Sequence, residues 1–236
     1  MKIIRLIKKL LNPIKKFGSN IEWRSKIVDL FIVIIGITLA FRLNAWSESK
    51  KQDDLLSTYL TSFDNENASN IMSLNEVLAA SHEQLAKVDT LQHIMRIGNY
   101  ADQRLSRWSP SLLNAINYKP TLITLESIKE SGDFELIKNY ELKRKIITAY
   151  ESLVHLKEQE LVLNDYVKNI TRPYFFEKIR YRDFYPVDDE GLIRDHRFEN
   201  IIIGYGLIMR NQIQGYDSVM VNLLNLKDEL SGYTNK

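Results

Sequence analysis

The residues of this chain that could do chemistry do not fall into the spacings that a reaction or a metal needs. Its histidines form neither a His-x-x-x-His nor a His-Glu-x-x-His pair, so each is expected to be a surface or packing residue: His82, His93, His155 and His196. Cysteine is absent, which excludes disulfides, thiolate nucleophiles and cysteine-bound metals. The acidic run Asp188-Asp189-Glu190-Gly191 lacks the alternating oxygen ligands of a calcium loop and is interpreted as a solvated loop.

Motifs for catalysis are also lacking: the chain has no phosphate-binding glycine loop, no serine nucleophile elbow and no pair of catalytic carboxylates. The sequence therefore predicts a protein that is not an enzyme and holds no metal or cofactor. Asp29 is unusual because it lies about one helical turn inside an apolar stretch. An acid inside a membrane can couple proton movement. A carboxylate in a first helical turn, three residues from Lys26, also suits the membrane interface.

The apolar stretch itself, residues 27–41, predicts a membrane anchor. It is short for a span, but Trp23 and Trp46 flank it and would lie ~35 Å apart along a helix, near the two membrane interfaces. Lys26 and Arg42 mark its charged ends. We therefore predict an uncleaved transmembrane helix over residues 26–46.

The charge of the first 26 residues predicts the orientation of this anchor. Eight Lys and Arg stand against Glu22 alone, so the positive-inside rule places the N-terminus in the cytoplasm and the C-terminal part across the membrane. Apolar residues at helical spacing predict that residues 1–25 form a basic amphipathic helix on the membrane, with anionic lipid and not nucleic acid as its partner. A disordered basic tail is the alternative.

One face of the predicted span carries small and polar residues. Gly36 and Ala40 form a small-xxx-small pair, Asn44 continues the line, and Asp29 lies seven residues before Gly36. Small residues allow helices to approach closely, and Asn can hydrogen-bond across the contact. This face therefore predicts self-association in the membrane and a homo-oligomer.

Long stretches without glycine or proline predict that residues 47–236 form one all-α domain. Residues 37–97 and 133–172 contain neither residue, and their apolar positions recur every three or four residues. We expect three long antiparallel helices in a coiled-coil-like bundle, with short helices packed at one end that start at Pro110 and Pro120.

Two features are expected to weaken the long helices. The polar run 64–70 is poor in helix formers and is expected to fray or kink the first helix. The last helix, over roughly residues 198–230, is expected to be loosened by its three glycines, which are Gly204, Gly206 and Gly215.

Residues 172–185 mix arginine with aromatic residues, as recognition surfaces do. The candidates for a partner surface at the end of the bundle are Arg172, Tyr174, Arg180, Tyr181, Arg182 and Tyr185. The alternative is that the aromatic residues close the end of the bundle and the arginines lie at its rim. A periplasmic location argues against nucleic acid as the partner, although basic and aromatic mixtures can bind it.

Several short motifs resemble those of one protein family. They are Ile35-Gly36-Ile37-Thr38-Leu39-Ala40 followed by Asn44-Ala45-Trp46, then Leu125–Gly132, Leu136–Asn139 and Ile146–Tyr150. Together they resemble an uncharacterised family of single-pass membrane proteins that is frequent in Bacteroidota and has no established activity. Asp29 and Arg42 depart from its pattern, where Glu and Gln are expected. The resemblance implies a diderm host, an inner-membrane anchor and a periplasmic domain.

These features predict a membrane-anchored periplasmic helical subunit that serves interaction or assembly, with a possible membrane-protein partner. Two alternatives remain open at this point. One is a ligand-sensing helical bundle that signals through a partner, because the cytoplasmic segment is too short to signal alone. The other, which depends on Asp29, is a subunit of a proton-driven membrane machine.

Overall fold

The computed structural model describes residues 23–182 and 185–234. It confirms the all-α class, with 85% helix and 2% strand. The chain forms two compact units, residues 1–55 and residues 56–236, and each is described by itself. The predicted amphipathic helix and its contact with anionic lipid fall almost wholly outside the described residues.

The first helix, α2 (Trp23–Arg96), runs for 74 residues without a break. It ends just before Gly98, whose positive φ of 68° suits glycine. The Gly98 amide donates to Met95 O (3.0 Å) and the Asn99 amide to Ile94 O (3.1 Å), which satisfies two carbonyls of the last turn. The polar run 64–70 stays helical, so the predicted weak point is wrong.

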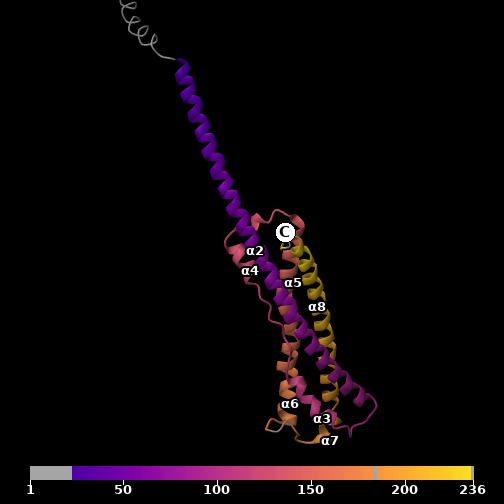
Figure 1. Cartoon of the computed structure of the whole chain (residues 1–236). Coiled ribbons are helices and arrows are strands. Elements are labelled where there is room, and N and C mark those ends of the chain that lie inside the picture. Colours follow the sequence, from indigo (N-terminus) through magenta and orange to yellow (C-terminus); the bar gives the residue numbers. More distant parts are fainter. Residues whose placement is uncertain (1–22, 183–184, 235–236) are drawn as a thin grey trace, which may run out of the picture. The chain divides into compact units, whose positions relative to one another are not determined.

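The second unit is built around three long helices (Figure 1). They are the later part of α2, α5 (Tyr140–Tyr166) and α8 (His196–Thr234). The Asn67 amide of α2 donates to Leu223 O of α8 (2.9 Å), and that of Gln92 donates to Ile202 O (3.2 Å). Residue numbers therefore rise along α2 while they fall along α8, so the two helices are antiparallel.

Helices α5 and α8 are antiparallel as well. Lys145 near the start of α5 forms an ion pair with Glu229 near the end of α8 (2.7 Å), and the Tyr166 hydroxyl at the other end donates to Asn200 O (3.3 Å). Helices α2 and α5 consequently run in the same direction. The predicted antiparallel arrangement is therefore wrong for the successive long helices α2 and α5, because the long connection between them returns the chain along the bundle.

Short elements occupy both ends of the bundle and not one end alone (Figure 1). The connection from α2 to α5 contains α3 (Arg104–Trp108), the 3₁₀ helix η1 (Ser109–Leu113), α4 (Ile123–Glu130) and the 3₁₀ helix η2 (Asp133–Leu136). Pro110 lies in the first turn of η1 as predicted, whereas Pro120 lies in extended chain before α4. Asn139 then caps α5 by accepting from the Leu142 amide (3.0 Å).

Between α5 and α8 the chain makes a compact turn. A π-helical turn, η3 (Val167–Thr171), leads into α6 (Arg172–Lys178), and a small hairpin follows, which the sequence did not predict. Its strands are β1 (Ile179–Arg180) and β2 (Tyr185–Pro186), and they are antiparallel. The acidic run predicted as a loop instead starts α7 (Asp189–Ile193), with Asp188 as its N-cap.

The glycines of α8 mark close contacts and not weak points. A Cβ on Gly206 would lie 2.6 Å from Gln92 Nε2, and one on Gly204 or Gly215 would collide with Tyr166 or with a glutamine of α5. Small residues are needed there because neighbouring side chains lie against the backbone of α8. The helix therefore continues unbroken through all three positions.

Candidate functional site

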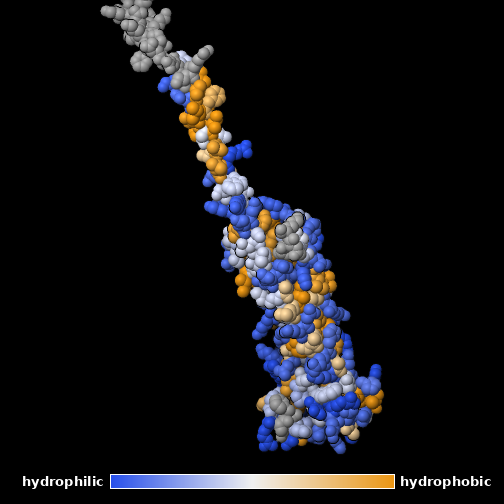
Figure 2. Space-filling view, viewed as in Figure 1, coloured by the Kyte–Doolittle hydropathy of each residue, from blue (hydrophilic) through white to orange (hydrophobic). Residues whose placement is uncertain are grey.

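The apolar part of α2 is the clearest functional segment of the first unit. Among the described residues, one helix is long and apolar enough to cross a membrane, and none of its apolar window is buried. Figure 2 shows this window as an apolar band on α2, and its large side chains from Ile27 to Leu43 are exposed. The Thr38 hydroxyl donates to Ile34 O (2.7 Å), so this group is satisfied within the helix.

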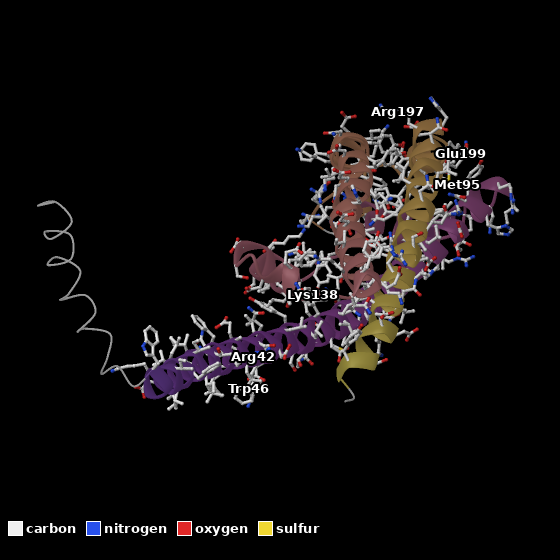
Figure 3. All side chains as sticks on the ribbon, turned by 90° about the horizontal axis from the view of Figure 1, so that it is seen from above. Arg42, Trp46, Met95, Lys138, Arg197 and Glu199 are labelled. Atoms are coloured by element: carbon white, nitrogen blue, oxygen red, sulfur yellow. The ribbon has the colours of Figure 1, made fainter. Side chains whose placement is uncertain are left out.

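The residues predicted to drive self-association share one face of this helix. Asp29, Gly36, Ala40 and Asn44 are exposed, and intervals of seven, four and four residues bring them to the same side. A Cβ on Gly36 would meet no atom within 4 Å, so contacts within the chain do not require glycine there. Trp46 projects from the helix beyond them (Figure 3), with Lys50 Nζ 5.9 Å from its ring centroid. Self-association through this face stays a prediction.

A network of polar side chains in the second unit holds the connection between α2 and α5. We call residues 111–124 the crossover segment. Its middle is extended, so its backbone groups have no helical partners of their own. Side chains of the surrounding helices bind these groups instead, and they come from four elements: Glu66, Asn70 and Gln84 of α2, Glu160 of α5, Arg172 of α6, and Tyr205 and Gln212 of α8.

Asn70 and Glu66 bind the end of the crossover segment nearest α4. Asn70 Oδ1 accepts from the Thr121 amide (2.9 Å), and its Nδ2 donates to Thr121 O (2.8 Å), so one side chain satisfies both backbone groups. Glu66 Oε2 accepts from the Thr124 amide (2.9 Å), while its other oxygen accepts from the Tyr150 hydroxyl (2.6 Å). The polar run expected to weaken α2 thus positions the crossover segment.

Glu160 is the buried acid at the centre of the network. Its Oε1 accepts from the Tyr118 amide and from the Tyr216 hydroxyl, both at 2.6 Å, and only 5% of the residue is exposed. Gln212 donates to the same Tyr216 oxygen (2.6 Å) and to Ile116 O (2.7 Å). Helices α5 and α8 therefore hold the middle of the crossover segment through one connected set of hydrogen bonds.

Burial controls the protonation of this set. It raises the pKa of the Glu160 carboxyl, although hydrogen bonds from Tyr118 and Tyr216 act in the opposite direction. Burial also raises the pKa of Tyr118 to about 12 and raises that of Tyr216, where the hydrogen bond to Glu160 adds to the effect. Both tyrosines therefore remain hydrogen-bond donors at physiological pH. The arrangement holds the crossover segment in place.

Sequence reasoning missed this network, although the sequence carried a signal for it. Asn67 and Asn70 lie between Phe63 and Leu74 at intervals of four, three and four residues, which are core positions of a helix. Polar residues at core positions predict buried hydrogen bonds. The partners could not be predicted, because they lie on segments more than 50 residues away in the chain.

The predicted partner surface divides into a buried part and an exposed part. Tyr174 is 2% exposed and donates to Asp195 Oδ2 (2.9 Å), so it belongs to the core and its prediction as a surface residue is wrong. Arg172 is exposed, but its Nε donates to Leu113 O (3.1 Å) and so helps to hold the crossover segment. Arg180, Tyr181, Arg182 and Tyr185 are exposed on the hairpin.

Helix α8 presents an outer face with little charge. Of the 27 residues 200–226, two are charged, Arg210 and Asp217, whereas nine of the 27 residues of α5 are charged. Four large aliphatic side chains of α8 are exposed on this face: Ile203, Leu207, Val221 and Leu224. Depletion of charge beside exposed aliphatic side chains is typical of protein interfaces.

Two open clefts border α8. One, of about 570 Å³, lies between the end of α2 and the start of α8, where Met95 and Glu199 are neighbours (Figure 3). The other, of about 400 Å³, lies between α5 and α8 and is lined by uncharged polar residues such as Gln159 and Gln214. Within the described part of the chain, no three His, Asp or Glu side chains gather closely enough to hold a metal ion.

Comparison with known proteins identified no relative of this chain. Neither the protein-family models, nor the curated proteins, nor the solved structures match the chain. Function is therefore inferred from the composition, the sequence motifs and the geometry of the chain itself.

Proposed function

We propose that this protein is a membrane-anchored periplasmic subunit that serves interaction or assembly and acts as a homo-oligomer. Its anchor is the apolar part of α2, whose exposed side chains favour a lipid environment over water. The basic leader favours a cytoplasmic N-terminus and a bundle on the far side of the membrane. The family resemblance supports a bacterial inner membrane as the location.

The outer face of α8 is the observation that carries the interaction role. Leu207 is 57% exposed and Val221 is 56% exposed, and the stretch between them holds two charged residues, Asp217 and Arg210, of which Arg210 pairs with Asp89 of α2. A helix surface that faces only water usually carries more charged residues than residues 200–226 of α8 do. Helix α5, with nine charged residues, illustrates this. We propose that this face binds a second copy of the chain, which anchoring in one membrane would hold close by.

The interior of the bundle supports the same role. The crossover segment runs along the three long helices, and buried polar side chains such as Asn70, Glu160 and Gln212 hold it. A rigid bundle of this kind suits a scaffold that presents its outer faces. It offers less to a small ligand, which would need an enclosed pocket.

Topology can be tested directly because the chain has no cysteine. We expect a membrane-impermeant maleimide to label Lys157→Cys in intact spheroplasts, since Lys157 is exposed on α5. A cysteine at Ser19 in the leader should be labelled only after lysis. Labelling of Ser19→Cys in intact spheroplasts, with Lys157→Cys protected, would reverse the proposed orientation.

Interaction is tested by gentle detergent extraction of the full chain followed by size and composition analysis. The proposal expects a discrete oligomer, with or without a second protein. A monomer at every detergent and protein concentration would count against an assembly role.

A further inference from the structure

We propose that two copies of the chain pair along α8 in parallel and in register, so that Asn211 and Gln214 of one copy each face the same residue of the other. This inference rests on the pairing through α8 proposed above, and it adds the direction of the pair and the residues that set its register. We call the line of contact the α8 seam, and its residues are Ile203, Leu207, Asn211, Gln214, Ser218 and Val221.

The α8 seam is one continuous line on the outer side of the helix. Its residues follow one another at steps of three and four, so at 3.6 residues per turn they lie within about 40° of a single line along α8. All of them are exposed. Leu207, Gln214 and Val221 recur every seven residues, and Asn211 and Ser218 form a second row between them. This is the heptad spacing of helices that pair along their length.

The chemistry of the α8 seam is self-complementary. In a symmetric dimer the residues near the two-fold axis meet their own copies, so a charged residue there would repel itself. The two charged residues of this stretch, Arg210 and Asp217, lie beside the seam and not on it, and Arg210 forms an ion pair with Asp89 of α2. Aliphatic side chains pack against copies of themselves, and an amide can both donate to its copy and accept from it. A second copy therefore suits every position of the seam.

Asn211 and Gln214 set the register of the pair. Within the described part of the chain their side-chain amides bind no other group, whereas Asn67 and Gln212 on inner faces bind backbone carbonyls. An amide in a helix–helix contact penalises every register that places it against an apolar side chain. A shift by one heptad would place Gln214 opposite Val221. The in-register pair keeps each amide against an amide.

The anchor selects the direction of the pair. An antiparallel pair centred on Gln214 would place Leu207 opposite Val221, which is also aliphatic, so the seam by itself suits both directions. The proposed span lies near the N-terminal end of both copies, and anchoring in one membrane holds these two ends on the same side. A shared membrane therefore favours the parallel pair.

Single-cysteine variants of the full chain in native membranes test direction and register. We expect Leu207→Cys to form a disulfide with the same position of a second copy, and Val221→Cys to do likewise. The two positions are 14 residues apart, or about 21 Å along α8, whereas a disulfide needs Cα atoms within about 7 Å. A single antiparallel or shifted pair cannot give both disulfides. When differently tagged Leu207→Cys and Val221→Cys chains are co-expressed, they should form no mixed disulfide.

The outcomes separate this inference from the proposed function. A mixed disulfide would overturn the parallel register and leave the assembly role standing. So would a disulfide at Gln214→Cys without disulfides at both Leu207→Cys and Val221→Cys. No disulfide at any of the three positions would refute the pairing through α8 itself.

A charge at Asn211 tests whether this residue faces its own copy. Asn211→Glu and Asn211→Lys should each raise the dissociation constant of the dimer in detergent on the order of ten-fold, the effect of about 1.4 kcal/mol, because like charges then oppose each other. Co-expression of the two variants should restore the dimer as a mixed pair. Asn75→Glu, at an exposed position of α2, is the matched control and should leave the dissociation constant unchanged. Equal effects of Asn211→Glu and Asn75→Glu, or no recovery in the mixed pair, would overturn the inference.

Discussion

Replacing Asn70 with leucine is the sharpest test of how the bundle is built. Judged by helix propensity alone, Asn70→Leu removes a poor helix former and should stabilise α2 by a few tenths of a kcal/mol. The structure predicts the opposite, because Asn70 binds both backbone groups of Thr121 and accepts from the Tyr118 hydroxyl (3.1 Å). Leucine can make none of these hydrogen bonds.

The magnitude follows from the groups that lose their partner. Each buried polar group left unsatisfied costs about 1–3 kcal/mol. The Thr121 amide and carbonyl lose their partner, whereas the Tyr118 hydroxyl keeps a bond to Asn70 O (3.1 Å). Thr121 is half-buried, so water recovers part of the loss. We expect a net loss of about 2–4 kcal/mol, or a fall in melting temperature of about 4–16 °C for a domain of this size.

The assay is thermal unfolding of the full chain in detergent, followed by circular dichroism at a helical wavelength. Asn75→Leu is the matched control, since Asn75 is exposed on the same helix, five residues further on. That control should change the free energy of unfolding by less than about 0.5 kcal/mol. If both variants melt alike, Asn70 does not hold the crossover segment.

Three further predictions address the core, the buried acid and the span. Phe175→Ala should cost about 3–5 kcal/mol because Phe175 is fully buried, whereas Phe176→Ala should stay within about 0.5 kcal/mol; chemical denaturation measures both, and equal losses would contradict the division. Glu160 has a raised folded-state pKa, so its contribution to stability is present below its unfolded pKa and is lost as pH rises through the folded pKa. Glu160→Gln should therefore gain stability relative to the natural chain as pH rises from 4 to 7, and a pH-independent difference in melting temperature would refute the cause. Gly36→Leu should weaken self-association of the anchor in detergent while Ile35→Leu should not, because bulk at Gly36 prevents close helix approach; equal assembly would exclude this face.

Much of the architecture could be predicted because it depends on local pattern. Periodic apolar residues in stretches without glycine or proline predicted most of α2 and the whole of α5. The direction of α5 relative to α2 could not be predicted from such patterns. It depends on an extended connection whose backbone is satisfied by side chains distant in sequence.

The candidate surfaces were predicted unevenly for a related reason. The mixture of arginine and aromatic residues pointed to the segment around the β1–β2 hairpin, but composition could not separate Tyr174, which is buried, from Tyr185, which is exposed. That division depends on the hairpin, whose strands of two residues each leave almost no pattern in the sequence. For the outer face of α8, the low number of charged residues is visible in the sequence. The exposure of its aliphatic side chains is visible only in the structure.

Disulfide crosslinking of single-cysteine variants in native membranes tests the central claim of assembly most directly. Because the chain has no other cysteine, a covalent dimer can form only through the introduced residue. Gln214→Cys, at the middle of the α8 face, should give a disulfide-linked dimer of twice the 27.6 kDa chain under mild oxidation. Lys157→Cys, exposed on α5, should remain monomeric. No dimer at Gln214→Cys, or equal dimer at both positions, would contradict assembly through α8.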